Sequence, residues 1–162
     1  MQYKRFEDLP VWQESVELAR LMYEFTALEP FHRHPGLRDQ LERAALSVSN
    51  NIAEGFERGT TNELLAFLYI ARGSSGEVRS MMRVLERWKL FSQCKSQISN
   101  FIVRCEKISK QLYGWIESLK NSEIPGQRRL DERAKNHYAS KREREEFLEE
   151  LRRISDKSEK DS

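Results

Sequence analysis

The residues best suited to chemistry are two glutamates, Glu54 and Glu77, in two predicted helices. On a helical wheel at about 100° per residue, Glu77 and Ser74 fall inside the apolar arc of their helix. Two carboxylates in a shielded site can act as general acid and base, or as metal ligands. The sequence therefore offers either a carboxylate site or a buried network of hydrogen bonds.

A wedge of polar side chains lies beside the apolar stripe of the helix predicted from residue 37 to Gly55. A carboxylate on a core face must be paired or protonated, because a lone charge in a low-dielectric interior costs several kcal/mol. We expect Arg43 to pair with Glu77, so that Glu77→Ala unfolds or disassembles the protein. We interpret the set as a structural polar network rather than a catalytic site: Gln40, Arg43, Ser47, Asn51, Glu54, Ser74 and Glu77.

The histidines do not complete a metal site with these glutamates. A di-metal bundle uses Glu-x-x-His pairs on facing helices, and no histidine follows Glu54 or Glu77 at that spacing. His32 and His34 fall in a predicted loop, and His137 falls in a predicted linker. The chain also lacks a P-loop, a zinc spacing, a glycine fingerprint and a nucleophile–base pair. We therefore expect no metal, no cofactor, no catalytic residue and no enzymatic activity.

Four arginines form a strip on one side of the third predicted helix, within about 80° on the wheel. They are Arg72, Arg79, Arg83 and Arg87. Each guanidinium can pair with a phosphate, so the strip predicts salt-dependent, sequence-tolerant binding of RNA or DNA. The alternative is an ordinary solvated helix face, since arginine is a good helix former. Neither an aromatic sheet motif nor a G-x-x-G loop of an RNA-binding module is present.

These side chains need helices to position them, and four helical stretches are predicted. The first starts at Asp8, as a capping residue, and ends at Glu29-Pro30; a loop follows at 31–36 and the second helix spans 37–55. The third starts at the capping box of residues 60–63 and extends to about Lys89, and the fourth spans about 95–120. Short connections favour antiparallel neighbours. Residues 1–124 are therefore predicted to form an all-α, antiparallel up-down four-helix bundle.

Composition agrees with long, solvated helices. The 162 residues include 28 basic and 26 acidic side chains but only 7 glycines, which disfavours a sandwich or barrel. Cys94 and Cys105 are too far apart along one helix for a disulfide, so idle thiols are expected. There is no apolar run for a membrane span and no secretory signal. We expect no membrane partner and a cytoplasmic location.

Residues 125–162 read as a charged C-terminal extension. Apolar periodicity stops after residue 124 and resumes in a short amphipathic helix of about 141–154, opened by a second capping box. A helix of this length is marginal alone, so it either docks or frays. The alternative function is therefore a protein-binding adaptor or scaffold that uses this helix and binds no nucleic acid.

Several of these positions carry a resemblance to the 23S rRNA intervening-sequence protein family. The chain has the stretch Q-x-x-R-A-x-x-S at residues 40–47, N-I-A-E-G at 51–55 and A-x-G-S-x-x-E at 71–77. The resemblance spans residues 6 to about 120. Its signature positions coincide with the polar wedge and are interpreted as fold-defining: Gln40, Arg43, Ser47, Asn51, Ile52, Ala53, Glu54, Gly55, Gly73, Ser74 and Glu77.

The resemblance implies a four-helix bundle that commonly assembles as a homopentamer. It also implies a relation to the accessory protein of diversity-generating retroelements, in which a basic ring contacts nucleic acid and a reverse transcriptase. We therefore expect a non-enzymatic homo-oligomer that binds RNA or DNA, and a reverse transcriptase or another protein is a candidate partner for the C-terminal helix.

Overall fold

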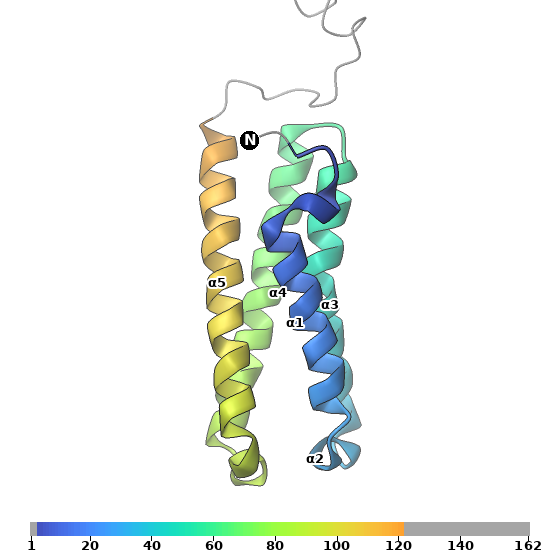
Figure 1. Ribbon diagram of the computed structural model, residues 1–162, viewed down its shortest axis with the longest axis vertical. Coiled ribbons are helices and arrows are strands. Elements are labelled where there is room, and N and C mark those ends of the chain that lie inside the picture. The colour runs from blue at the N-terminus through green and yellow to red at the C-terminus, as the bar shows by residue number, and fades with distance from the viewer. Residues whose placement is uncertain (1–2, 122–162) are drawn as a thin grey trace, which may run out of the picture. The chain divides into compact units, whose positions relative to one another are not determined.

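The computed structural model describes residues 3–121, which form an all-α bundle of four long helices (Figure 1). These are α1 (Pro10–Thr26), α3 (Pro35–Glu57), α4 (Thr61–Arg87) and α5 (Lys95–Lys120), with the one-turn helix α2 (Glu29–His32) between α1 and α3. No strand occurs within residues 3–121. The predicted all-α four-helix bundle is confirmed. The predicted boundary after residue 124 and the helix of about 141–154 lie outside the described residues.

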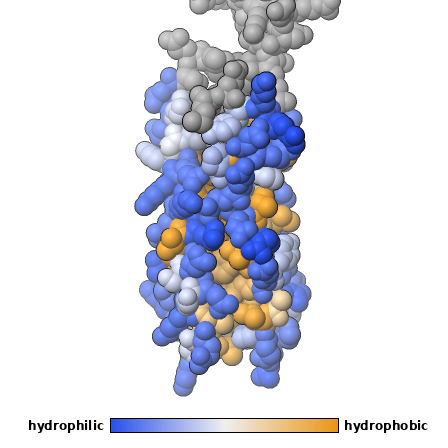
Figure 2. Space-filling model, in the orientation of Figure 1, coloured by the Kyte–Doolittle hydropathy of each residue, from blue (hydrophilic) through white to orange (hydrophobic). Residues whose placement is uncertain are grey.

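The four long helices pack side by side as a square (Figure 1). α3 packs against both α1 and α4, and α5 packs against both α4 and α1. α1 and α4 therefore lie across a diagonal, and α4 has one seam with α3 and another with α5. The face seen in Figure 2 is largely hydrophilic, with hydrophobic residues gathered in its lower half.

The first helix begins differently from the prediction. Asp8 closes a 3₁₀ turn, Phe6–Asp8, and Leu9 occupies the N-cap without a side-chain hydrogen bond. Pro10 can open α1 because the N–H of the first helical residue has no acceptor within the helix. A proline, which has no N–H, therefore loses no hydrogen bond at this position. For the same reason Glu29-Pro30, expected to end the helix, instead opens α2 within the predicted break. Phe31 of α2 is fully buried, with its ring centroid 5.0 Å from that of Phe25.

The junction between α3 and α4 follows the capping-box prediction. The Thr60 hydroxyl accepts a hydrogen bond from the Glu63 backbone N–H at 3.2 Å. Helix α3 continues through Gly55, where it was expected to end. An added Cβ at Gly55 would lie only 2.7 Å from the Cβ of Phe67. Glycine therefore allows α3 and α4 to approach closely here.

The core faces of α3 and α5 agree with the predicted stripes, whereas that of α4 is rotated by about one residue. In α4, Ser75 is buried while Ile70 and Glu77 are exposed. The prediction that Glu77 lies on a core face is wrong. The buried residues of α4 are Thr61, Leu64, Leu68, Ala71, Ser75, Val78, Met82 and Leu85.

The buried serine has a partner on the neighbouring helix. The Ser75 hydroxyl donates to the carbonyl oxygen of Cys105 in α5, at 3.1 Å. Both cysteines are free and buried, as expected, and burial raises the pKa of the Cys105 thiol to about 12. Ser75 and Cys105 thus lie in a buried layer beneath the surface of the α4/α5 contact. None of the helices within residues 3–121 is apolar and long enough to cross a membrane.

Candidate nucleic-acid interface

Three of the four predicted arginines lie on the side of α4 that faces α5: Arg72 and Arg79 line a groove with α5, and Arg83 lies 3.8 Å from Glu106 of α5. All four recur at intervals of four or seven residues, which keeps them on one helix face. From Arg72 to Arg87 the strip extends about 22 Å along the helix axis. Arg72, Arg83 and Arg87 are exposed, and the Arg79 side chain is 43% exposed. All four remain accessible to a ligand from solvent.

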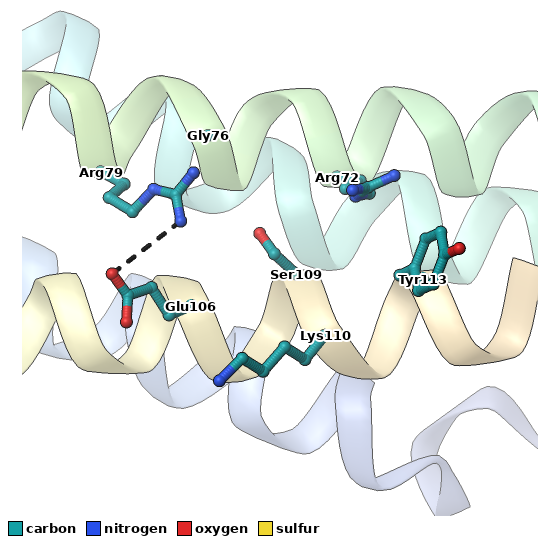
Figure 3. A pocket seen from close by; sticks show the side chains of 7 residues that line it. All are labelled: Arg72, Gly76, Arg79, Glu106, Ser109, Lys110 and Tyr113. Atoms are coloured by element: carbon teal, nitrogen blue, oxygen red, sulfur yellow. Dashed lines mark ion pairs between the residues drawn. The ribbon is translucent and has the colours of Figure 1, made fainter.

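The strip borders a groove between α4 and α5 with a volume of about 410 Å³ (Figure 3). Helix α4 lines it with Arg72, Gly76 and Arg79. Helix α5 lines it with Glu106, Ser109, Lys110 and Tyr113. Two of the four arginines, Arg72 and Arg79, therefore line a groove shared with α5, whereas Arg83 and Arg87 lie outside its lining.

The carboxylate of Glu106 is the counter-charge inside this groove. It lies 4.0 Å from Arg79 and 3.8 Å from Arg83, while Glu86 lies 3.2 Å from Arg83. These side chains are 40 to 52% exposed, so each pair stabilises the bundle by at most about 1 kcal/mol. The guanidiniums are thus held loosely.

Two tyrosines on the same side of the bundle each lie under a cation. The Arg72 guanidinium carbon is 5.1 Å from the ring centroid of Tyr113, and the Lys120 ammonium is 5.7 Å from that of Tyr69. Hydrogen bonds to Tyr69 and then to Glu117 raise the pKa of Lys120 above its usual value, so the ammonium stays charged. The α4/α5 side therefore alternates positive charge with exposed aromatic rings.

The α5 half of this groove was missed from the sequence. Glu106, Lys110 and Tyr113 recur at helical spacing, which places them on one face of α5. That spacing is visible in the sequence, and antiparallel pairing of α4 with α5 would have brought it opposite the arginine strip. What the sequence does not show is how far each helix is rotated about its axis.

The predicted polar network lies along the other seam of α4, facing α3. Ser47 and Ser74 share a hydrogen bond of 3.0 Å across the helices, and Asn51 donates to the Ser47 hydroxyl at 2.9 Å. Arg43 donates to the side-chain oxygen of Gln40 at 2.7 Å, and Gln40 in turn donates to Glu77. Two of these contacts, Ser47 with Ser74 and Gln40 with Glu77, link α3 to α4.

The network differs from the prediction at its charged members. Glu77 and Arg43 are exposed, and Arg43 is connected to Glu77 through Gln40 rather than by the expected ion pair. Glu54 lies apart and pairs with Arg58 at 2.6 Å. The rotation of α4 is the reason, because it turns residue 77 from the core to the surface. Glu54 and Glu77 do not form a shared carboxylate site.

A more enclosed carboxylate is Glu14 of α1, which the sequence did not single out. Its side chain is 15% exposed and lies 2.5 Å from Arg104 and 2.6 Å from Lys107 of α5. The hydrogen bond from Lys107, followed by the charges of both partners, holds the pKa of Glu14 below its usual value. This cluster joins α1 to α5. Its members are about 90 residues apart in sequence, so no local pattern reveals it.

Neither seam has the residues of a metal centre. No cluster of three or more His, Cys, Asp or Glu side chains suited to a metal occurs within residues 3–121. The α4/α5 groove is lined by three cations, one carboxylate and one aromatic ring, together with Gly76 and Ser109. Gly73, a signature position of the resemblance, has open space around it: a Cβ there would meet nothing within 4 Å.

Comparison with known proteins agrees with the fold and with the family resemblance. Residues 7–114 match the family described as 23S rRNA-intervening sequence protein. A crystal structure of a protein of unknown function from the S23 ribosomal protein family of Bacteroides thetaiotaomicron is similar, with a TM-score of 0.59 and 19% identity. The match covers 66% of this chain and 98% of that protein, and at this identity it shows the fold alone. No curated protein matches.

Proposed function

The chain belongs to the 23S rRNA-intervening sequence protein family, and we propose that it is a non-enzymatic bundle that binds nucleic acid through the α4/α5 side. The observation that carries the proposal is the gathering of guanidiniums along the α4 side of an open groove, with the Lys110 ammonium on its α5 side. Among the residues that line the groove, three are cations, Arg72, Arg79 and Lys110, and one is a carboxylate, Glu106.

The position of Glu106 supports an anionic ligand. Its carboxylate lies between Arg79 and Arg83 at 3.8 to 4.0 Å, which is longer than the 2.7–2.9 Å of a good charge-assisted hydrogen bond. A phosphate that made closer, bidentate contacts with the same guanidiniums would interact with them more strongly than the Glu106 carboxylate does. Glu106 therefore orients the arginines in the free protein without competing strongly for them.

A salt titration of binding tests the proposal. Fluorescence anisotropy with a labelled single-stranded oligonucleotide should show affinity that falls steeply with salt, because each phosphate contact adds about 0.7 to the logarithmic slope. Arg79→Glu with Arg83→Glu should reduce that slope by about 1.4 and weaken binding at least about tenfold.

The control variant carries the same change of charge on the diagonal helix. Arg5→Glu with Arg20→Glu alters exposed residues in and just before α1, and the Arg20 and Arg83 side chains are both 52% exposed. This control should keep the salt slope of the unmodified protein. Equal loss in both double variants, or loss in neither, would contradict a binding site on the α4/α5 side.

We further propose that the protein forms a homo-oligomer, with the pentamer implied by the resemblance as the expected state. Two large apolar residues on the outer side of α4 support a subunit contact: Ile70 is 51% exposed and Val84 is 60% exposed. They are fourteen residues apart, close to four helical turns, so they lie on nearly the same face. Such a face would also present the arginine strip several times.

Multi-angle light scattering tests the assembly. The unmodified protein should have a mass several times that of one chain, and Ile70→Glu with Val84→Glu should lower it. Val103→Glu on α5 is a matched control, since Val103 is also 60% exposed. A monomeric mass for the unmodified protein would overturn the proposal. The alternative adaptor function through the helix of about 141–154, and any partner enzyme, stay predictions because that segment lies outside the described residues.

A further inference from the structure

We infer that the α4/α5 side takes single-stranded nucleic acid, whose bases stack on Tyr113 in the groove and on Tyr69 beside Lys120 while its phosphates meet the arginines. The inference rests on the proposed function and names the ligand class of the same site. It is carried by the aromatic rings beside the cations, a feature that phosphate binding alone does not require.

The two tyrosines have the exposure that a stacking surface needs. Tyr113 is 51% exposed and Tyr69 is 45% exposed, so both rings are accessible to a ligand rather than packed in the core of the bundle. Every nucleobase has a π face that can stack on an aromatic ring or on the plane of a guanidinium. The pairing of Arg72 with Tyr113 at 5.1 Å places both kinds of surface at one point (Figure 3).

The floor of the groove is kept open by a glycine without a packing role. Gly76 lies between Arg72 and Arg79 along the lining, and a Cβ there would meet no atom within 4 Å. Glycine in the middle of a helix is less stable than alanine, so the bundle would gain stability from a methyl group at this position. The packing of the bundle therefore does not explain a glycine at this position. The space that the glycine leaves open gives a nucleobase room beside Tyr113.

A duplex cannot use these features. Its bases are stacked on one another and paired, so it presents phosphates to the arginines and leaves the tyrosines without a partner. Extruding a base from a duplex costs unstacking and unpairing energy, whereas a single strand offers its bases freely. The combination of tyrosines and arginines thus selects the single-stranded form.

Three oligonucleotide probes of equal length separate stacking from charge. They are a single strand, the same strand with abasic sites in place of all its bases, and its duplex, each measured by anisotropy on the full chain. The single strand should bind about tenfold or more tightly than the abasic strand, which keeps every phosphate but has no base to stack.

Variants of the tyrosines locate the effect. Tyr113→Ala should weaken binding of the single strand about tenfold and leave binding of the abasic strand unchanged, whereas Tyr113→Phe should retain tight binding because the ring remains. Tyr23→Ala on α1 is the matched control, since Tyr23 is 47% exposed and lies on the helix diagonal to α4. The melting temperature of each variant checks that the bundle is intact.

The outcomes distinguish this inference from the proposed function. Equal affinity for the single strand and the abasic strand, with the arginine dependence intact, would overturn stacking and leave phosphate binding standing. Tighter binding of the duplex would overturn the single-strand assignment. Absence of salt-dependent binding to all three probes would overturn the proposed function and the inference together.

Discussion

Helix α4 has two seams, and they are built on opposite principles. Towards α3 the seam is closed: glycine at position 55 brings the helices together, and Ser47 and Ser74 bond across it at 3.0 Å. Towards α5 the surface is open: Gly76 lies under a groove of about 410 Å³, bordered by long cationic side chains. The same residue type therefore serves close packing on one side of the helix and empty space on the other.

The polar groups of the two seams differ in the same way. Across the α3 seam, the hydroxyls of Ser47 and Ser74 share a hydrogen bond of 3.0 Å, and Gln40 donates to Glu77. In the α5 groove, Arg79 and Arg83 reach Glu106 only at 4.0 and 3.8 Å. A seam whose hydrogen bonds are complete has little to offer a ligand. Loosely paired guanidiniums keep donors available, and this contrast is what places the candidate ligand site on the α5 side.

The largest effect is expected for Gly55→Ala. The added Cβ would lie 2.7 Å from the Cβ of Phe67 and 3.2 Å from a methyl carbon of Leu64, and the Phe67 Cβ cannot rotate away. Helices α3 and α4 would have to separate, at a cost of about 1–3 kcal/mol of unfolding free energy. Urea denaturation followed by circular dichroism measures the loss. Unchanged stability would show that α3 and α4 are not closely packed at Gly55. It would contradict the proposed difference between the α3 and α5 sides of α4.

A second prediction concerns the buried layer beneath the groove, at Cys105. The thiol is fully buried, and burial raises its pKa to about 12 in the folded protein, while the unfolded chain has the ordinary value near 8.5–9. Between these values the folded state holds a proton that the unfolded state has lost. Stability is therefore full below about pH 8.5 and declines as pH rises, by about 1.4 kcal/mol between pH 8 and pH 10.

Comparison with Cys105→Ala isolates this thiol from the lysines and tyrosines that titrate in the same range. The variant is less stable at pH 8 because of the cavity, but its stability should decline less steeply with pH than that of the unmodified protein. Parallel pH profiles of the two proteins, measured by urea denaturation, would mean that water reaches Cys105 from the groove above it.

Gly76→Ala should act in the opposite direction to Gly55→Ala. Because no atom lies within 4 Å of the added Cβ, the variant should gain about 0.5–1 kcal/mol from reduced freedom of the unfolded chain. If the groove accepts bases, the same methyl group should also weaken binding of a single strand. The gain is measured by urea denaturation, and a loss of stability would mean that the floor of the groove is already packed.

How much the sequence alone could predict depended on the helix. The stripes of α3 and α5 were correct: Leu41, Val48 and Ile52 of α3 and Ile98, Ile108 and Ile116 of α5 are all buried. In α1 and α4, large apolar residues also stand outside, such as Tyr23 and Ile70, whereas Ser15 and Ser75 are inside. A buried serine costs little when its hydroxyl donates to a carbonyl, as Ser15 does to Val11 at 2.6 Å. In α4 the predicted apolar arc included Ser74, whereas the structure buries its neighbour Ser75.

The same reasoning explains which part of the candidate site was found. The arginine strip belongs to one helix, so spacing along the chain was enough to reveal it. Glu106, Lys110 and Tyr113 join it only through the packing of α5, and their meaning depends on the rotation of both helices. The network of Gln40, Ser47 and Ser74 was visible in the sequence as a wedge of polar residues. How far each side chain is buried was not visible, because burial depends on the packing of the assembled bundle.

The smallest effect is expected for Glu77→Ala, the change that the sequence predicted to be the most damaging. Glu77 is exposed and accepts a hydrogen bond from Gln40, so its loss leaves no buried charge and should cost less than about 1 kcal/mol. Urea denaturation at low and high protein concentration measures this cost. A loss above about 3 kcal/mol would show that the carboxylate is enclosed after all, because only a buried, paired charge is so costly to remove. If that loss depended on protein concentration, the enclosure would come from a second copy of the chain packed on the α3/α4 seam.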